Sequence, residues 1–213
     1  VKNEEKKEFR NPRAPFTTST LQQEASRKLN FSASRTMRAA QKLYEGLNIG
    51  SEVTGLITYM RTDSVQLSKD SITDLREMIS NEYGKSYCPE KLKIYKSKVA
   101  NAQEAHEAIR PTDVKRIPKT VKAYLDDDCY KLYDLIWKRT VSSQMASAII
   151  NKTIIDVESI NKSDIQNFVT LRANGSVIKF DGFLKIYNEG VDEKNSAEMD
   201  DNIIPQVNIG EKL

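Results

Sequence analysis

The chain has 213 residues, which is enough for one or two domains with a buried core. Charged residues make up 30% of it, but the net charge is only +3, so charge alone is a weak argument for a polyanionic partner. Two cysteines, Cys88 and Cys129, exclude a disulfide framework or a zinc quartet, and no apolar run reaches the ~20 residues of a membrane helix. The charged, abrupt start over residues 1–10 leads us to expect a piece of a longer protein.

The first two thirds of the chain are predicted to be mainly helical. Ser19 and Thr20, placed before Gln22 and Gln23, form a capping-box pattern that predicts where the first helix begins. Capping residues and apolar stripes predict helices over 20–29, 34–45, 68–84, 103–109 and 126–147, with a Lys-rich loop over 85–100. The first two helices and the strand expected after them resemble a winged-helix unit, although many helix pairs bind no nucleic acid.

Near residue 150 the apolar residues change from helical to alternating spacing, which predicts a β-rich portion. Strands are expected over 153–160 and 183–187, with a hairpin between them that turns at Asn174-Gly175. The acidic stretch 191–202 is expected to be a loop. The fold class is therefore α+β, with an N-terminal segment over 1–15, a helical domain over 16–147 and an antiparallel β portion over 148–213.

The run Gly-Leu-Ile-Thr-Tyr-Met-Arg-Thr-Asp-Ser, residues 55–64, carries the chemistry of the chain. If it forms a strand, Tyr59 and Arg61 share one face. A phenol has an ordinary pKa of about 10, and a neighbouring guanidinium favours the phenolate and can also hold a phosphate oxygen. The pair therefore fits phosphoryl transfer to tyrosine. The alternatives are a packing role for Tyr59 and a surface ion pair between Arg61 and Asp63.

Further polar residues are candidates for contact with phosphate. His106 is the only histidine, and on a helix it would share a face with Arg110. Both could contact a phosphate, or His106 could be a satisfied helix residue and Arg110 a structural anchor. Thr20 and Gln23 lie near a helix N-terminus, which can bind phosphate or simply be capped. The acidic run 126–128 cannot converge on one ion and complements a helix dipole instead, so no metal site is predicted.

The run 55–64 closely resembles the active-site signature of type IA DNA topoisomerases, the bacterial topoisomerase I branch in particular. Three more segments resemble that family in the same order: Pro-Phe-Thr-Thr-Ser-Thr-Leu-Gln-Gln at 15–23, Gln-Glu-Ala-His-Glu-Ala-Ile-Arg-Pro-Thr at 103–112, and Asp-Gly-Phe-Leu-Lys-Ile-Tyr at 181–187. The resemblance implies that Tyr59 attacks single-stranded DNA to form a 5′-phosphotyrosine link, and that Arg61 positions the scissile phosphate. It also implies a role for His106 in DNA binding.

The same resemblance implies an enzyme that relaxes negative supercoils by strand passage without ATP, in a bacterial cytoplasm near the nucleoid. Magnesium would be held by a separate metal-binding (TOPRIM) domain, because no Asp-x-Asp-x-Glu pattern occurs here. The expected partners are single-stranded DNA and the other domains of the same enzyme, with no membrane. The β portion would form one side of the family's arch and residues 1–15 part of the other. Alone, the chain is expected to turn over poorly or not at all.

Three alternatives remain open. On the resemblance alone, the chain could belong to reverse gyrase or a decatenating relative, although Met60 resembles topoisomerase I, because those relatives often have proline there. It could be a non-catalytic nucleic-acid-binding module. It could also be a structural piece, in which case the Tyr59 hydroxyl would be buried with a protein partner.

Overall fold

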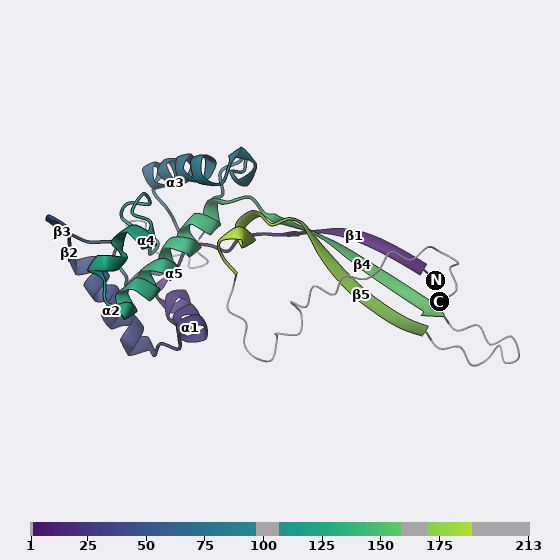
Figure 1. Ribbon diagram of the computed structural model, residues 1–213, viewed down its shortest axis with the longest axis horizontal. Coiled ribbons are helices and arrows are strands. Elements are labelled where there is room, and N and C mark those ends of the chain that lie inside the picture. Colours follow the sequence, from purple (N-terminus) through teal and green to yellow (C-terminus); the bar gives the residue numbers. More distant parts are fainter. Residues whose placement is uncertain (1, 97–106, 159–169, 189–213) are drawn as a thin grey trace, which may run out of the picture. The chain divides into compact units, whose positions relative to one another are not determined.

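A computed structural model describes residues 2–96, 107–158 and 170–188 (Figure 1). The described residues form two compact units, one from 2–11 and 147–182 and the other from 12–146 and 183–188. The first unit is an antiparallel sheet and the second is mainly helical, so the predicted α+β class is confirmed. No helix in the described part of the chain is long and apolar enough to cross a membrane.

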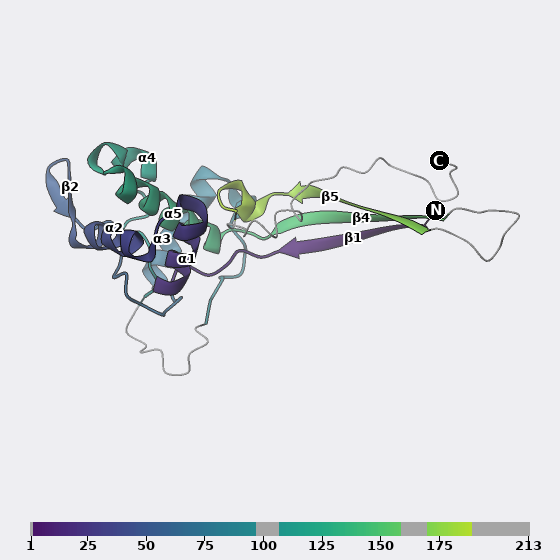
Figure 2. The same ribbon diagram turned by 90° about the horizontal axis from the view of Figure 1, so that it is seen from below.

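The sheet unit has three strands in the order β1-β4-β5, seen side by side in Figure 2. They are β1 (Lys2–Arg10), β4 (Ala148–Glu158) and β5 (Thr170–Phe180). Charged pairs join neighbouring strands. Asp156 and Arg172 lie directly opposite each other and form a two-pronged ion pair, with N–O distances of 2.7 and 3.0 Å.

Three predictions about the β portion were wrong. Asn174-Gly175 is not a turn, because β5 runs straight through it and pairs with β4 at Ile154 and Thr153. Because β4 pairs with the backbone of both residues, the Asn-Gly sequence stays extended and does not turn. The N-terminal segment, predicted to form the other side of the arch, lies in the same sheet as the β portion, because β1 pairs with β4 along its whole length.

The third error concerns residues 183–187, which are not a strand. A 3₁₀ helix, η3 (Gly182–Lys185), occupies most of this stretch, and residues 183–187 belong to the helical unit. Phe183 and Tyr187 are both buried, and the Phe183 amide donates to the carbonyl oxygen of Ala146 at 3.0 Å. Burial of these two aromatic side chains therefore decides the conformation over the alternating sequence pattern.

Helix α5 (Asp127–Gln144) is the centre of the helical unit, and twelve of its eighteen residues are buried. A helix that is apolar on one face only would leave more residues exposed, so α5 is a core helix packed on several sides. The elements around it are α1 (Thr18–Leu29), α2 (Ala33–Glu45), α3 (Lys69–Glu82) and α4 (Pro118–Val121). A short hairpin of β2 (Leu47–Ile49) and β3 (Glu52–Thr54) follows α2.

Four of the predicted helices are confirmed, with ends that agree to within three residues. The first begins earlier than predicted because Thr17 is its N-cap and forms the capping box with Thr20. The Lys-rich stretch contains one short 3₁₀ helix, η1 (Lys85–Tyr87), and is otherwise irregular up to residue 96. Residues 97–106 and the acidic stretch 191–202 lie outside the described residues.

A buried polar network joins the two segments of the helical unit. The Tyr187 hydroxyl donates to Oε1 of Glu24 at 2.8 Å, and Nη1 of Arg139 donates to the same hydroxyl at 3.3 Å. The Arg139 Nε also donates to the carbonyl oxygen of Ala14 at 2.7 Å. Glu24 is only 3% exposed, so its carboxylate depends on the Tyr187 hydroxyl, and on Lys28 with Nζ at 3.6 Å, in place of water.

The network predicts that Tyr187→Phe will lower the free energy of unfolding by about 1–3 kcal/mol, because a buried carboxylate loses a donor. Urea denaturation of the purified chain measures this difference. The matched control is Tyr124→Phe, which removes a hydroxyl from a side chain that is 46% exposed. Equal stabilities for the two variants would contradict the prediction.

Candidate functional site

The segment that carries Tyr59 is not a strand, contrary to prediction. Ile57 makes an isolated bridge with Pro111, and residues 58–64 belong to no strand ladder. The segment instead bonds to three separate parts of the helical unit: Leu56 N donates to Leu43 O at 2.7 Å, Thr58 N to Arg110 O at 2.9 Å, and Thr18 N to Thr62 O at 2.9 Å. Its backbone groups are satisfied by contacts distant in sequence, which local spacing does not reveal.

Exposure nevertheless alternates along this segment. Tyr59 is 41% exposed, and Arg61 and Asp63 are also exposed. The residues between them, Met60, Thr62 and Ser64, are buried. Both members of the predicted pair therefore reach solvent, and the 41% exposure of Tyr59 speaks against a role as a core residue. Among the described residues no ion pair joins Arg61 to Asp63, and both side chains are exposed.

Two threonines fix the backbone on either side of Tyr59. The Thr58 hydroxyl donates to Ala108 O at 2.7 Å and accepts from Arg110 N at 3.0 Å. The Thr18 hydroxyl donates to Met60 O at 2.8 Å and accepts from Thr62 N at 2.8 Å. In a regular strand Thr58 would face away from Tyr59, so sequence spacing alone does not reveal this role.

The end of α2 lies directly against the start of the segment. A Cβ atom added to Gly55 would lie 2.5 Å from the carbonyl oxygen of Tyr44, closer than any side chain permits. Glycine therefore allows the backbone to approach α2, and four residues later the Tyr59 ring meets the Tyr44 ring with centroids 5.3 Å apart.

Arg110 lies beside this segment, but not on a helix. Residues 107–109, predicted as the end of a helix, are extended: Ala108 N donates to Gln66 O, and Ile109 bridges Phe16. Here each amide bonds to a distant partner, so no helical turn forms. His106 lies outside the described residues, so its pairing with Arg110 stays a prediction.

The Arg110 guanidinium is held by protein groups. Its Nη2 and Nε donate to Oε2 of Glu107 at 2.7 and 3.0 Å, and its Nη1 donates to Pro111 O at 2.9 Å. Although partial burial raises the pKa of the Glu107 carboxyl, hydrogen bonds from Arg110 and Ser68 outweigh it and hold that pKa below its ordinary value. This geometry fits the anchoring alternative for Arg110.

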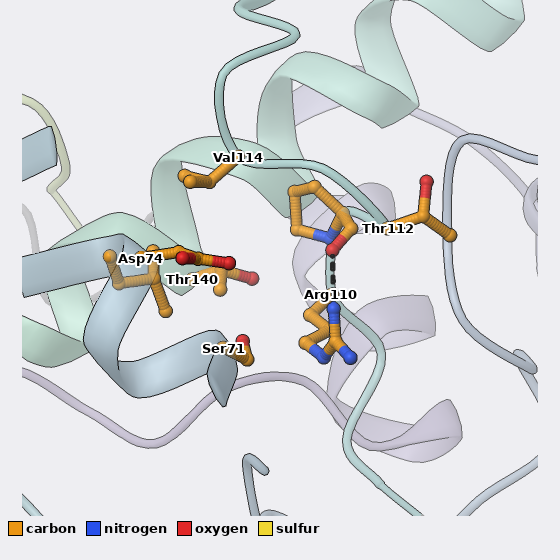
Figure 3. Close-up of a pocket in the computed structure, with 8 residues that line it drawn as sticks. Ser71, Asp74, Arg110, Thr112, Val114 and Thr140 are labelled. Carbon is orange, nitrogen blue, oxygen red and sulfur yellow. Dashed lines mark hydrogen bonds between the residues drawn. The ribbon is translucent and has the colours of Figure 1, made fainter. Parts of the chain in front are cut away.

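A small cavity lies beside Arg110, between α3, α5 and residues 110–114 (Figure 3). Its volume is about 10 Å³, which is room for no more than one water molecule. The buried Thr140 hydroxyl and the Asp74 side chain also line it. The cavity is too small for a nucleotide or any comparable ligand.

The other two predicted site residues lie on α1. The Thr20 hydroxyl accepts from Thr17 N at 2.9 Å and so is used in the helix cap. Gln23 is exposed one turn further along the helix. The bonds of Thr18 bring the N-terminus of α1 against the backbone at Met60 and Thr62, so this end of the helix is part of the site.

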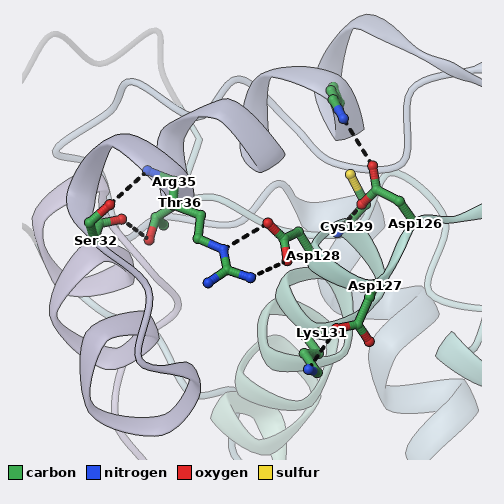
Figure 4. Close-up of polar contacts among 9 residues, drawn as sticks. Ser32, Arg35, Thr36, Asp126, Asp127, Asp128, Cys129 and Lys131 are labelled. Atoms are coloured by element: carbon green, nitrogen blue, oxygen red, sulfur yellow. Dashed lines mark hydrogen bonds and ion pairs between the residues drawn. The ribbon is translucent and has the colours of Figure 1, made fainter.

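The three acidic side chains at the start of α5 do not converge on a common point, as a metal site would require (Figure 4). Asp126 caps the helix by accepting from Cys129 N at 2.8 Å and also pairs with Lys42 at 2.9 Å. Asp128 pairs with Arg35 of α2 at 2.7 Å, and Asp127 pairs with Lys131 at the same distance. Each carboxylate faces its own cation. Over the described residues, no three His, Cys, Asp or Glu side chains form a group that could hold a metal ion.

The fold and the site together define a helical domain that presents a tyrosine and an arginine to solvent beside a helix N-terminus. The chain matches, over residues 1–213, the family described as DNA topoisomerase, and it belongs to that family.

Known relatives agree with this assignment. DNA topoisomerase 1 of Rickettsia felis is 52% identical over 212 residues, covering 100% of this chain and 26% of the relative. DNA topoisomerase 1 of Xylella fastidiosa strain Temecula1 is 48% identical, covering 100% and 25%. The solved structure of full-length topoisomerase I from Thermotoga maritima superposes with a TM-score of 0.73 at 35% identity, covering 90% of this chain and 30% of that one. The chain thus spans about a quarter of the length of the curated relatives it matches.

The close approach at Gly55 predicts that Gly55→Ala will destabilise the chain by about 1–3 kcal/mol, because the new methyl group meets backbone and not a flexible side chain. Urea denaturation gives the value. Ser51→Ala, at an exposed position nearby, is the control and should change stability by less than about 0.5 kcal/mol.

The α5 cap predicts a pH-dependent stability. The hydrogen bond from Cys129 N, and then the bond from Lys42, lower the pKa of Asp126 to about 2. A lowered folded-state pKa contributes stability above the unfolded pKa of about 3.9 and loses it as pH falls toward about 2. Wild type should therefore exceed Asp126→Asn in unfolding free energy at pH 7, and the difference should vanish as the pH is lowered to about 2.

Thermal and urea unfolding at pH 7, 5, 4, 3 and 2 would follow this difference. Asp127→Asn is the matched control, because the Asp127 side chain is 71% exposed and pairs only with Lys131 among its described neighbours. A difference for Asp126→Asn that stays constant across the series would contradict the assigned role of its charge.

Proposed function

We propose that this chain is the tyrosine-bearing part of a topoisomerase I that cleaves and rejoins single-stranded DNA, with Tyr59 as the nucleophile. The observation that carries the proposal is the exposure of Tyr59 and Arg61 on a segment whose backbone is fixed on both sides by Thr18 and Thr58. Family membership supplies the reaction class. Strand passage through the break, without ATP, would relax negative supercoils.

The chemistry is a transesterification. The Tyr59 Oη loses its proton and bonds to the phosphorus atom, while the bond from phosphorus to the 3′ oxygen breaks and that oxygen gains a proton. One phosphodiester replaces another, so the energy of the broken bond is kept for rejoining and no ATP is needed. The exposed Arg61 guanidinium would hold a non-bridging phosphate oxygen.

The remaining candidates would contact DNA beside this centre. Thr20 and Gln23 lie at the N-terminal end of α1, where partial positive charge favours phosphate. His106 retains its proposed DNA-binding role from the family resemblance. Arg110 is proposed to act mainly through its hold on Thr58, because Glu107 already engages its guanidinium.

Other parts of the proposal concern the rest of the enzyme. Magnesium would be bound outside this chain, since the described acidic residues do not fit a metal site, and it would supply charge stabilisation at the phosphate. The sheet unit is proposed to belong to the family's arch. The partners would be single-stranded DNA and the remaining domains, in a bacterial cytoplasm near the nucleoid.

The test uses single-stranded DNA labelled at its 3′ end. The chain is incubated with this DNA and magnesium, with and without the separately supplied metal-binding domain, and then denatured. We expect label on the protein when the domain is present, and none with Tyr59→Phe. Loss should exceed a thousandfold because the nucleophile itself is removed.

Tyr44→Phe and Tyr124→Phe are the matched controls, since each removes a hydroxyl from another exposed tyrosine of the same unit. Both should still form the adduct. Failure of all mixtures to transfer label, in a complex shown to assemble and bind DNA, would reject the catalytic assignment and favour a nucleic-acid-binding module.

A further inference from the structure

The Tyr59 ring meets one aromatic neighbour in the described structure. The rings of Tyr44 and Tyr59 have centroids 5.3 Å apart and planes inclined at 65°, which is an edge-to-face arrangement. Each side chain is 41% exposed, so each is partly in water and partly against the other. Neither ring belongs to the buried core, and the contact lies at the surface where Tyr59 would meet DNA.

The χ1 torsion of a tyrosine has three staggered rotamers, and each places the hydroxyl in a different position. In-line attack on phosphorus requires one of them, because the oxygen must be placed within a few tenths of an ångström of its target. A neighbouring ring that favours one rotamer therefore raises the fraction of the chain that is ready to react. The Tyr44 ring is the described group placed to do this.

Tyr44 is itself held firmly at its backbone. It lies in the last turn of α2, which ends at Gly46, where the Gly46 amide donates to Lys42 O at 3.3 Å. The preceding residue, Leu43, is fully buried and its carbonyl oxygen accepts from Leu56 N at 2.7 Å. Gly55 lies against the carbonyl oxygen of Tyr44 itself. The helix end that carries one ring thus also fixes the backbone that leads to the other.

We propose that Tyr44 is a positioning residue that holds the Tyr59 ring in the rotamer used for attack on DNA. The inference rests on the proposed function for its catalytic consequence, but the ring contact is independent of it. Tyr44 acts through its ring and not through its hydroxyl, so phenylalanine can replace it and an aliphatic residue cannot.

The first test compares Tyr44→Phe with Tyr44→Leu in the full-length protein, measured as the rate of adduct formation on saturating single-stranded DNA. An edge-to-face pair has the strength to change this rate about 3- to 10-fold. We expect that loss for Tyr44→Leu, near wild-type rates for Tyr44→Phe, and no loss for the matched control Tyr124→Leu. DNA affinity, measured in a Tyr59→Phe background, should be unchanged in all three.

Two results would overturn the proposal: a wild-type cleavage rate for Tyr44→Leu, or a loss of DNA affinity in that variant that accounts for its slower cleavage. Equal thermal midpoints for Tyr44→Leu and Tyr124→Leu would show that the effect is not one of stability.

A second readout separates this proposal from the proposed function. Tyrosine labelled on its ring and at its β position allows the ring contact and the Tyr59 side-chain couplings to be followed by NMR in this chain without DNA. Tyr44→Leu should shift the Tyr59 ring resonances and average its side-chain couplings, whereas Tyr124→Leu should not. Absence of any adduct in wild type, together with these shifts, would reject the proposed function and leave only the restraint of the Tyr59 ring by Tyr44. Unchanged Tyr59 couplings would reject the positioning role itself.

Discussion

The site depends on how the backbone around Tyr59 is held without a sheet. Hydroxyl groups of Thr18 and Thr58 each donate one hydrogen bond and accept another, and together they fix the chain from residue 58 to residue 62. A strand ladder would do the same with backbone groups alone, but it would also cover one edge of the segment with a neighbouring strand. Side-chain anchors leave the exposed residues open, which a reaction with a long polymer needs.

This arrangement explains why the helical unit is built as it is. Thr18 is available because α1 begins there, and α1 begins there because Thr17 and Thr20 cap it. Thr58 finds its partners because residues 108–110 are extended and are held by Glu107 and its bonds to Arg110 and Ser68. The core helix α5 supports the surrounding helices, and the Asp126 and Asp128 ion pairs join it to α2. The position of the tyrosine is thus set by the whole unit.

Local patterns predicted the helices well, because caps and apolar stripes act within a few residues of one another. They failed where the deciding contact is remote. The Asn174-Gly175 pair has a strong turn signal, yet β4 provides a partner for both sides of it. The strand expected at Tyr59 is absent because its hydrogen bonds go to residues more than ten positions away. The contact from Thr18 to Met60 spans 42 residues, and no local rule could find it. Tyr59 and Arg61 were chosen through the family resemblance, and the structure adds their exposure.

The alternation of exposure from Tyr59 to Ser64 has a consequence for natural variation. The buried positions are Met60, Thr62 and Ser64, and most substitutions there should lower stability. The exposed positions are Tyr59, Arg61 and Asp63, which add little to the core. A saturation library of this segment, scored once for protein abundance and once for growth, would therefore split into two interleaved sets. Substitutions at the exposed positions that reduce growth but not protein abundance would show selection on the reaction. Selection on folding would appear at the alternate positions of the same six codons.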